Sequence, residues 1–276
     1  MRTTIISILS VLGISLSGCT YTKVSDIAYQ PNKTLEYNLT QTLNVFSPKN
    51  APSKPVIIFV HGGNWNSGNK ETYNFYGRIW ARKDVVTVIP SYTLSPNANY
   101  DQMTAEIAQA INWTFENIEK YGGDPNQIFL NGHSAGGHLV ALAAMNPKYG
   151  IDETKIAGII FNDAAGIDMK NYLEKNPPTS QDNYLTTWTN NPEKWRDASP
   201  IYFINEKTPP MMIYVGTKTY QSIKTANKNF LKELHKVQPN VDPIYINKKH
   251  VPMMVQYFFP WSKRYDEIET FIEENK

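Results

Sequence analysis

One stretch of the chain decides the fold: Ile128-Phe129-Leu130-Asn131-Gly132-His133-Ser134-Ala135-Gly136-Gly137. It starts as an apolar strand-like run and contains Gly-x-Ser-x-Gly at 132–136, directly before a helical stretch at 137–145. Glycines on both sides of the serine remove side chains that would clash in a sharp strand-to-helix turn. Such a turn exposes the hydroxyl of Ser134 at the carboxyl end of a strand, so Ser134 is a candidate nucleophile.

Apolar runs like 128–130 recur along the chain and alternate with segments of helical periodicity. Continuous β-branched runs are typical of strands buried on both faces of a parallel sheet. Strands that alternate with helices need parallel crossovers, with helices on both faces. The sequence therefore predicts an α/β fold with a mostly parallel central sheet. The expected strands are 56–60, 85–89, 128–130, 156–161, 211–215 and 244–246, and the expected helices are 73–82, 100–121, 137–145, 222–236 and 265–274.

The segment 169–210 interrupts this alternation. It has no long apolar run, but it contains Pro177-Pro178, Trp188 and Trp195. Long insertions inside a compact domain are often lids or walls of a binding site. We therefore expect a lid-like insertion between the strands 156–161 and 211–215 of a single domain that spans 54–276. These are the sixth and seventh strands when two edge strands from the segment 19–53 are counted first.

The first 53 residues have a different character. Residues 1–18 contain Arg2, then an apolar run at 5–16, and end just before Cys19. A basic start, a short apolar core and small residues at the end are the layout of a secretory signal peptide. The more polar segment 19–53 is expected to form a tether followed by one or two edge strands.

The composition excludes several classes of protein. Lys and Arg number 27 against 25 Asp and Glu, and a net charge of +2 provides no basic field for a nucleic acid. With one cysteine, the chain forms no internal disulfide and no thiolate cluster. His, Asp and Glu do not have the spacing of metal ligands, so we expect neither a metal nor an organic cofactor.

A second glycine-rich loop, His61-Gly62-Gly63-Asn64-Trp65, follows the expected strand 56–60. Adjacent glycines let backbone N–H groups come close to a ligand. The N–H groups of Gly63 and Asn64, together with that of Ala135, are candidates for an oxyanion hole, which stabilises the tetrahedral intermediate of acyl transfer.

A serine nucleophile needs a base, and the chain has five histidines. His250 follows the expected strand 244–246 and is C-terminal to Ser134, in the chain order of nucleophile before base. We therefore assign His250 as the candidate base, in a loop before the final helix. The remaining histidines are assigned structural or surface positions: His61, His133, His138 and His235.

Together these motifs resemble the α/β-hydrolase superfamily, and more narrowly its HGG-containing esterases in the carboxylesterase, hormone-sensitive-lipase-like and feruloyl-esterase-like (BD-FAE) branches. The likeness is strongest along Tyr121-Gly122-Gly123-Asp124-Pro125 and from Ile128 to Leu139, and it covers the chain from about residue 56 onward. It implies an α/β-hydrolase domain at 54–276 and a Ser-His-acid esterase in which Ser134 is the nucleophile and His250 the base.

The segment Leu16-Ser17-Gly18-Cys19 resembles the lipobox of bacterial lipoproteins. This resemblance implies cleavage before Cys19 and acylation of that residue. The protein would then be held in the bacterial cell envelope, on the periplasmic face or the cell surface, with the membrane as a partner through its lipid anchor. An ordinary signal peptide followed by an incidental cysteine is the alternative.

The acid of the triad departs from the family pattern. The family usually has an Asp in a Val-Gly-x-x-Asp segment after the strand 211–215, but here this segment reads Val215-Gly216-Thr217-Lys218-Thr219. Neighbouring strand ends in a parallel sheet are about 5 Å apart, so an acid on the preceding strand can reach the same imidazole. Asp163 has that position and is the first candidate, followed by Asp168 and then Asp242.

The predicted activity is hydrolysis of a small-molecule carboxylic ester by a Ser-His-Asp mechanism with a backbone oxyanion hole. A peptidase or an aryl-formamidase on the same fold stays open, because the fold alone does not select the substrate. The alternative from another class is a catalytically decayed hydrolase that serves as a binding lipoprotein, because the usual acid is missing.

Overall fold

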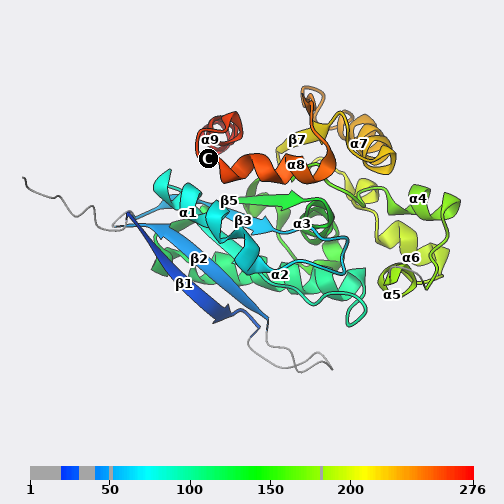
Figure 1. The fold of residues 1–276 in the computed structure, drawn as a ribbon, viewed down its shortest axis with the longest axis horizontal. Coiled ribbons are helices and arrows are strands. Elements are labelled where there is room, and N and C mark those ends of the chain that lie inside the picture. Colours follow the sequence, from blue (N-terminus) through cyan, green and yellow to red (C-terminus); the bar gives the residue numbers. More distant parts are fainter. Residues whose placement is uncertain (1–19, 31–40, 50–51, 181–182) are drawn as a thin grey trace, which may run out of the picture.

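The computed structural model describes residues 20–30, 41–49, 52–180 and 183–276 (Figure 1). Its strands are β1 (Tyr21–Ala28), β2 (Thr42–Pro48), β3 (Lys54–Val60), β4 (Val86–Pro90), β5 (Gly123–His133), β6 (Ile156–Asn162), β7 (Met211–Gly216) and β8 (Ile244–Ile246). They form one sheet in the order β1-β2-β4-β3-β5-β6-β7-β8. Strand β2 is antiparallel to both of its neighbours, and the strands from β4 to β8 pair in parallel. The predicted mostly parallel sheet is confirmed.

Helices cover both faces of this sheet (Figure 1). The α-helices in the described ranges are α1 (Asn74–Arg82), α2 (Tyr100–Asn117), α3 (Ala135–Met145), α4 (Met169–Lys175), α5 (Tyr184–Trp188), α6 (Pro192–Asp197), α7 (Gln221–Leu234), α8 (His250–Val255) and α9 (Lys263–Glu274). The longest, α2, starts with a capping box in which Asn99 and Gln102 bond each other's backbone N–H groups.

Strand β3 shows why the central runs are apolar throughout. Alternate residues of a strand point to opposite faces of the sheet. Val56, Ile58 and Val60 pack in the core shared with α2, α3 and α7, whereas Ile57 and Phe59 pack in the core shared with α1, α8 and α9. Both faces of β3 are therefore buried, and neither face has room for polar side chains.

The insertion between β6 and β7 contains the short helices α4, α5 and α6. Trp188 fixes its position, because the buried indole packs edge-on against Trp65 at 4.7 Å and stacks with Tyr100 of α2 at 5.7 Å between ring centroids. The insertion is thus packed onto the domain beside the second glycine-rich loop. Its role as a lid stays a prediction.

The N-terminal predictions fall mostly beyond the structure. The signal peptide at 1–18 and the lipidation site Cys19 lie outside the described residues. Strands β1 and β2, from the segment 19–53, occupy one end of the sheet, with β1 at the edge. In the part of the chain that the structure covers, no helix combines the length and the apolar character needed to cross a membrane.

One local prediction is wrong. The sequence places His250 in a loop, but His250 is the first residue of the short helix α8. With six residues, α8 is too short to show a helical repeat in the sequence. Its placement fixes the backbone of His250 at the carboxyl edge of the sheet.

Candidate active site

Ser134 occupies a strained turn between β5 and α3. Its φ of 55° and ψ of −122° lie outside the regions that L-residues favour, which costs about 1–3 kcal/mol. The turn is held by its backbone, because the N–H of Ser134 donates to the carbonyl of Asn162 (3.3 Å) and its carbonyl accepts from the N–H groups of Gly137 (3.0 Å) and Ala165 (3.1 Å). This backbone presents the hydroxyl of Ser134 to the cavity described below.

Glycine is required where α3 meets the strand ends. A Cβ atom on Gly136 would lie 2.0 Å from the carbonyl oxygen of Val60, and one on Gly132 would lie 2.4 Å from the carbonyl oxygen of Gly136. A Cβ on Gly62 would lie 2.9 Å from the Cβ of Ser134. The absence of side chains therefore brings the serine turn and the second glycine-rich loop into direct contact.

The structure brings together the three residues that the sequence assigns to the triad. The hydroxyl of Ser134 lies 2.8 Å from Nε2 of His250, and Nδ1 of His250 lies 2.6 Å from Oδ2 of Asp163. A carboxylate can only accept, so the proton of the neutral imidazole is on Nδ1 and Nε2 is free to accept the serine proton. This is the connectivity of a Ser-His-Asp triad.

The carboxylate of Asp163 is fully buried and has several donors. Oδ1 accepts from the N–H of Gly216 (2.9 Å), and Oδ2 accepts from the hydroxyl of Thr219 (2.5 Å) as well as from His250. Donors of this kind replace the water that a buried negative charge loses. These bonds fix the carboxylate in place, so that it holds the imidazole in one orientation.

The two other candidate acids lie elsewhere. Asp168 is on the cavity wall, where its Oδ2 accepts from the side-chain amide of Asn229 (2.7 Å), and it makes no contact with His250. Asp242 is exposed and precedes β8, whereas His250 follows that strand. Of the three acids considered, only Asp163 meets the imidazole.

Thr219 is the residue at this site that sequence reasoning missed. It stands where the family pattern Val-Gly-x-x-Asp has its acid, and its hydroxyl lies 3.4 Å from Nδ1 of His250. A threonine at that position carries no charge, so it supports Asp163 by a hydrogen bond instead of replacing it. The sequence contained a signal for this residue, because Thr219 occupies the position at which the family pattern has its aspartate.

The predicted oxyanion donors are located around Ser134. Gly63 and Asn64 line the same cavity as the serine, and no described residue accepts a hydrogen bond from either N–H group. Ala135 is the first residue of α3, so its N–H has no acceptor within the helix. All three amides are thus available to an oxyanion, and the helix dipole of α3 adds positive potential there.

The remaining histidines near the site do not compete with His250. Burial lowers the pKa of His61, His133 and His138 to about 4. All three are therefore neutral at pH 7, and no hydrogen bond joins any of them to the hydroxyl of Ser134. His235 is exposed at the end of α7, as the sequence predicts.

Ser134 and His250 line a cavity of about 700 Å³ whose walls include several aromatic side chains. Trp65 forms part of the wall and is held by His138, which accepts from the indole N–H at 3.2 Å. Trp188 and Trp195 are buried in the core and do not reach the cavity. The other aromatic residues of the cavity wall are Tyr73, Phe75, Tyr172, Tyr184, Tyr220 and Phe258.

In the ranges that the structure describes, no three His, Cys, Asp or Glu side chains gather as a metal site.

A comparison with protein families places the chain. The model of the BD-FAE family matches residues 43–234, which is more than half of the chain. The chain belongs to the BD-FAE family. The matched region of this BD-FAE protein contains Ser134, Asp163 and the oxyanion loop, and it ends before His250.

Known esterases are among the similar proteins. Esterase LipC of Mycobacterium tuberculosis is 29% identical over 213 residues, which cover 71% of this BD-FAE chain and 53% of LipC. Isoprenylcysteine alpha-carbonyl methylesterase ICME of Arabidopsis thaliana is 36% identical over 104 residues, 37% of this chain and 24% of that protein. The chain spans about half or less of the length of these two relatives.

A solved structure supports the fold. The thermophilic esterase of the planctomycete Thermogutta terrifontis superimposes with a TM-score of 0.73, at 22% sequence identity, and the match covers 90% of each chain. The predicted α/β-hydrolase fold is thereby confirmed for this BD-FAE protein.

The position of Thr219 leads to a rescue experiment. Asp163→Asn removes the charge that holds the Nδ1 proton, so the rate at which a fluorophosphonate labels Ser134 should fall roughly a thousandfold or more. Adding Thr219→Asp to this variant puts a carboxylate beside Nδ1 of His250 and should raise the labelling rate again by at least about tenfold. Labelling rates are measured by mass spectrometry of the intact protein.

The matched control is Asp163→Asn with Thr217→Asp, which adds a carboxylate on the exposed side of the same loop. It should restore nothing. An unchanged labelling rate in the Asp163→Asn single variant would remove Asp163 from the triad.

The buried histidines predict how stability depends on pH. Their pKa is about 4 in the folded protein and near 6.5 in the unfolded chain, so between these values the unfolded chain binds more protons. The free energy of unfolding should therefore fall as the pH is lowered from 6.5 towards 4, by about 1.4 kcal/mol per pH unit for each histidine. Urea denaturation at several pH values measures this slope.

His138→Gln removes one of these groups and should reduce the slope by about that amount, whereas His235→Gln changes an exposed ring and should leave it unaltered. Equal slopes in wild type and His138→Gln would show that protonation of this ring is not linked to unfolding.

Proposed function

We propose that this BD-FAE protein is a serine hydrolase that cleaves carboxylic esters. The observation that carries the proposal is the unbroken hydrogen-bond chain from the hydroxyl of Ser134 through His250 to Asp163. Two similar proteins are named as esterases, which supports an ester as the bond that is cleaved. A decayed, purely binding protein has no physical reason to retain a strained serine turn aligned with an imidazole and a buried acid.

The chemistry follows from the geometry. Nε2 of His250 takes the proton of Ser134 as Oγ attacks the ester carbonyl carbon, and Asp163 stabilises the imidazolium that forms. The negative carbonyl oxygen of the tetrahedral intermediate accepts from the free N–H groups of Gly63, Asn64 and Ala135. When the intermediate collapses, His250 gives the proton to the leaving alkoxide.

Water then releases the acyl group. His250 takes a proton from a water molecule that attacks the carbonyl carbon of acyl-Ser134, and it returns this proton to Oγ as the acid leaves. Each half-reaction returns the imidazole to its neutral form with the proton on Nδ1. The aromatic and aliphatic side chains in the walls of the cavity favour esters with an apolar or aromatic portion.

The test combines a covalent probe with a substrate assay. A fluorophosphonate should label Ser134, and p-nitrophenyl acetate and butyrate should be hydrolysed. Ser134→Ala should abolish labelling and lower kcat by about 10⁶, as expected when the nucleophile of such a triad is removed. Ser180→Ala, at an exposed position of the insertion, is the matched control and should keep full activity.

Absence of both labelling and hydrolysis in a folded wild-type protein would leave the binding function as the better explanation. p-Nitroanilides and N-formyl anilines are assayed in parallel. Faster turnover of either amide than of the esters would redirect the proposal to a peptidase or an aryl-formamidase.

We further propose that Cys19 carries a lipid anchor that holds the protein in a bacterial cell envelope. The support is the segment Leu16-Ser17-Gly18-Cys19, which lies two residues before the start of β1 at Tyr21. Expression in a bacterial host with an alkyne fatty acid should label the wild type and not Cys19→Ala. Label in neither protein would favour an ordinary signal peptide.

A further inference from the structure

An exposed apolar surface surrounds α8, and we call the five side chains Val251, Val255, Phe258, Phe259 and Trp261 the rim patch. Trp261 is 80% exposed and Val251 is 62% exposed. Ten large hydrophobic side chains of the described residues are exposed, and seven of them lie between 220 and 261. Apolar exposure is therefore concentrated on one part of the molecule, which is a mark of an interaction site.

Helix α8 is apolar on both of its sides. Met253 and Met254 are buried against the sheet, whereas Val251 and Val255, one turn apart, point to solvent. A surface helix of a soluble domain ordinarily has polar residues on its outer side. The outer side of α8 is thus suited to contact something other than water.

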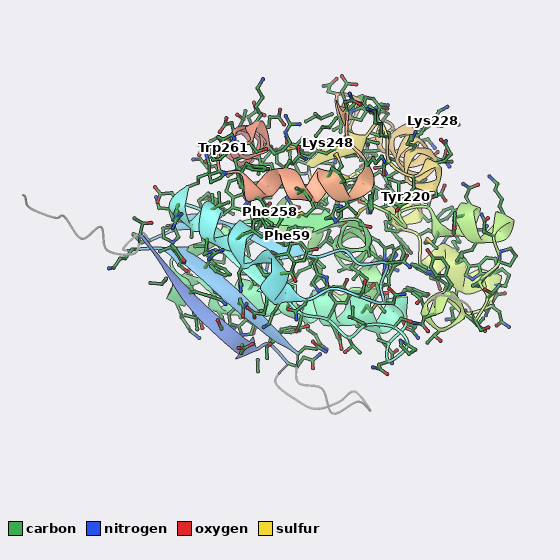
Figure 2. The ribbon with its side chains drawn as sticks, in the orientation of Figure 1. Phe59, Tyr220, Lys228, Lys248, Phe258 and Trp261 are labelled. Carbon is green, nitrogen blue, oxygen red and sulfur yellow. The ribbon has the colours of Figure 1, made fainter. Side chains whose placement is uncertain are left out.

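The rim patch is continuous with the mouth of the catalytic cavity. Val251, Val255 and Phe258 line that cavity. Val255, together with Phe259 and Trp261, also lines an adjoining depression of about 380 Å³. Figure 2 shows Phe258 and Trp261 towards one end of α8, while Tyr220 lies near the other end. A partner bound to the patch would therefore lie directly at the entrance to Ser134.

Several lysines lie near the patch, just before α8 and at the start of α9. Residues 217–264 contain nine Lys and Arg against two Asp and Glu, whereas the whole chain has 27 against 25. Lys248, Lys263 and Arg264 line the same depression as Trp261, and Figure 2 shows Lys248 beside α8 and Lys228 on α7. Within the described ranges, seven of the nine cations make no ion pair: Lys218, Lys224, Lys228, Lys232, Lys248, Lys249 and Lys263.

We propose that the rim patch and its lysines bind the surface of an anionic lipid bilayer. Aromatic side chains such as Trp261 and Phe259 insert at the level of the headgroups, and lysines around them are attracted to anionic lipids. A second copy of the chain fits less well, because a two-fold interface would place the same unpaired lysines against each other.

Binding of the rim patch to a bilayer also indicates a class of substrate, and this step rests on the proposed esterase activity. With the cavity mouth against the bilayer, an amphiphilic ester that partitions into the membrane surface can enter past Val251 and Phe258 without crossing water. Esters with a long acyl or alcohol chain are then the substrates that gain from the surface, because they are concentrated at the entrance to the cavity.

Tryptophan quenching tests the contact directly. Full-length protein with Cys19→Ala and Ser134→Ala, which has no cysteine to carry a lipid anchor, and the same protein with Trp261→Phe, are mixed with vesicles of brominated phosphatidylcholine, with and without phosphatidylglycerol. Bromine on the acyl chains should quench a component of the fluorescence on the anionic vesicles, and Trp261→Phe should lose that component. Trp113→Phe, a partly exposed tryptophan on α2, is the matched control and should retain it.

Charge is tested in the same assay. Each lysine near an anionic surface is worth about a fivefold change in partitioning, so Lys248→Gln with Lys263→Gln should lower binding roughly 25-fold. Lys120→Gln, on an exposed turn after α2, should have no effect. Salt should weaken the binding of the parent protein.

Three outcomes would overturn the proposal: no quenching on anionic vesicles, quenching unchanged by Trp261→Phe, or a mass of two chains in light scattering that falls to one chain in Trp261→Ser. The last would assign the patch to a second copy. Because the quenching assay uses Ser134→Ala and needs no turnover, its result is independent of the labelling test for esterase activity.

Discussion

The close approach of α3 to the carboxyl ends of β3 and β5 is the contact on which the rest of the site depends. Gly136 lies so near the carbonyl of Val60 that any side chain would displace the helix. This contact forces the backbone of Ser134 into its positive φ and brings the serine beside the second glycine-rich loop. The strain is tolerated because all residues of α3 are buried and cannot relax away from the sheet.

Because the acid directly follows β6, the position of the imidazole depends on several elements at once. The charge of Asp163 is satisfied by the backbone amide of the last residue of β7, a threonine hydroxyl in the following loop and His250 at the start of α8. An uncompensated carboxylate in this fully buried place would be very costly. The same bonds that pay this desolvation cost align His250 with Ser134.

The sequence predicts what local patterns encode. The run at 56–60 identifies a strand because both of its faces are buried, and the glycines around Ser134 identify the turn because no other residue fits. The chain order and the neighbours of the histidines single out His250. The choice of Asp163 over the other acids needs the distances between strand ends, which local patterns do not contain. The exposure of the rim patch could not be predicted either, because the hydrophobic pattern of a sequence does not show whether an apolar residue is buried or exposed.

The loop after β7 does not supply the acid of this triad. With the pattern Val-Gly-x-x-Asp this loop would carry the acid, and a change in its shape would also move that charge. Here Asp163 directly follows the neighbouring strand β6, and Tyr220, the residue after Thr219, lines the cavity. A substitution at position 220 therefore changes the wall of the cavity beside His250 without removing the acid of the triad.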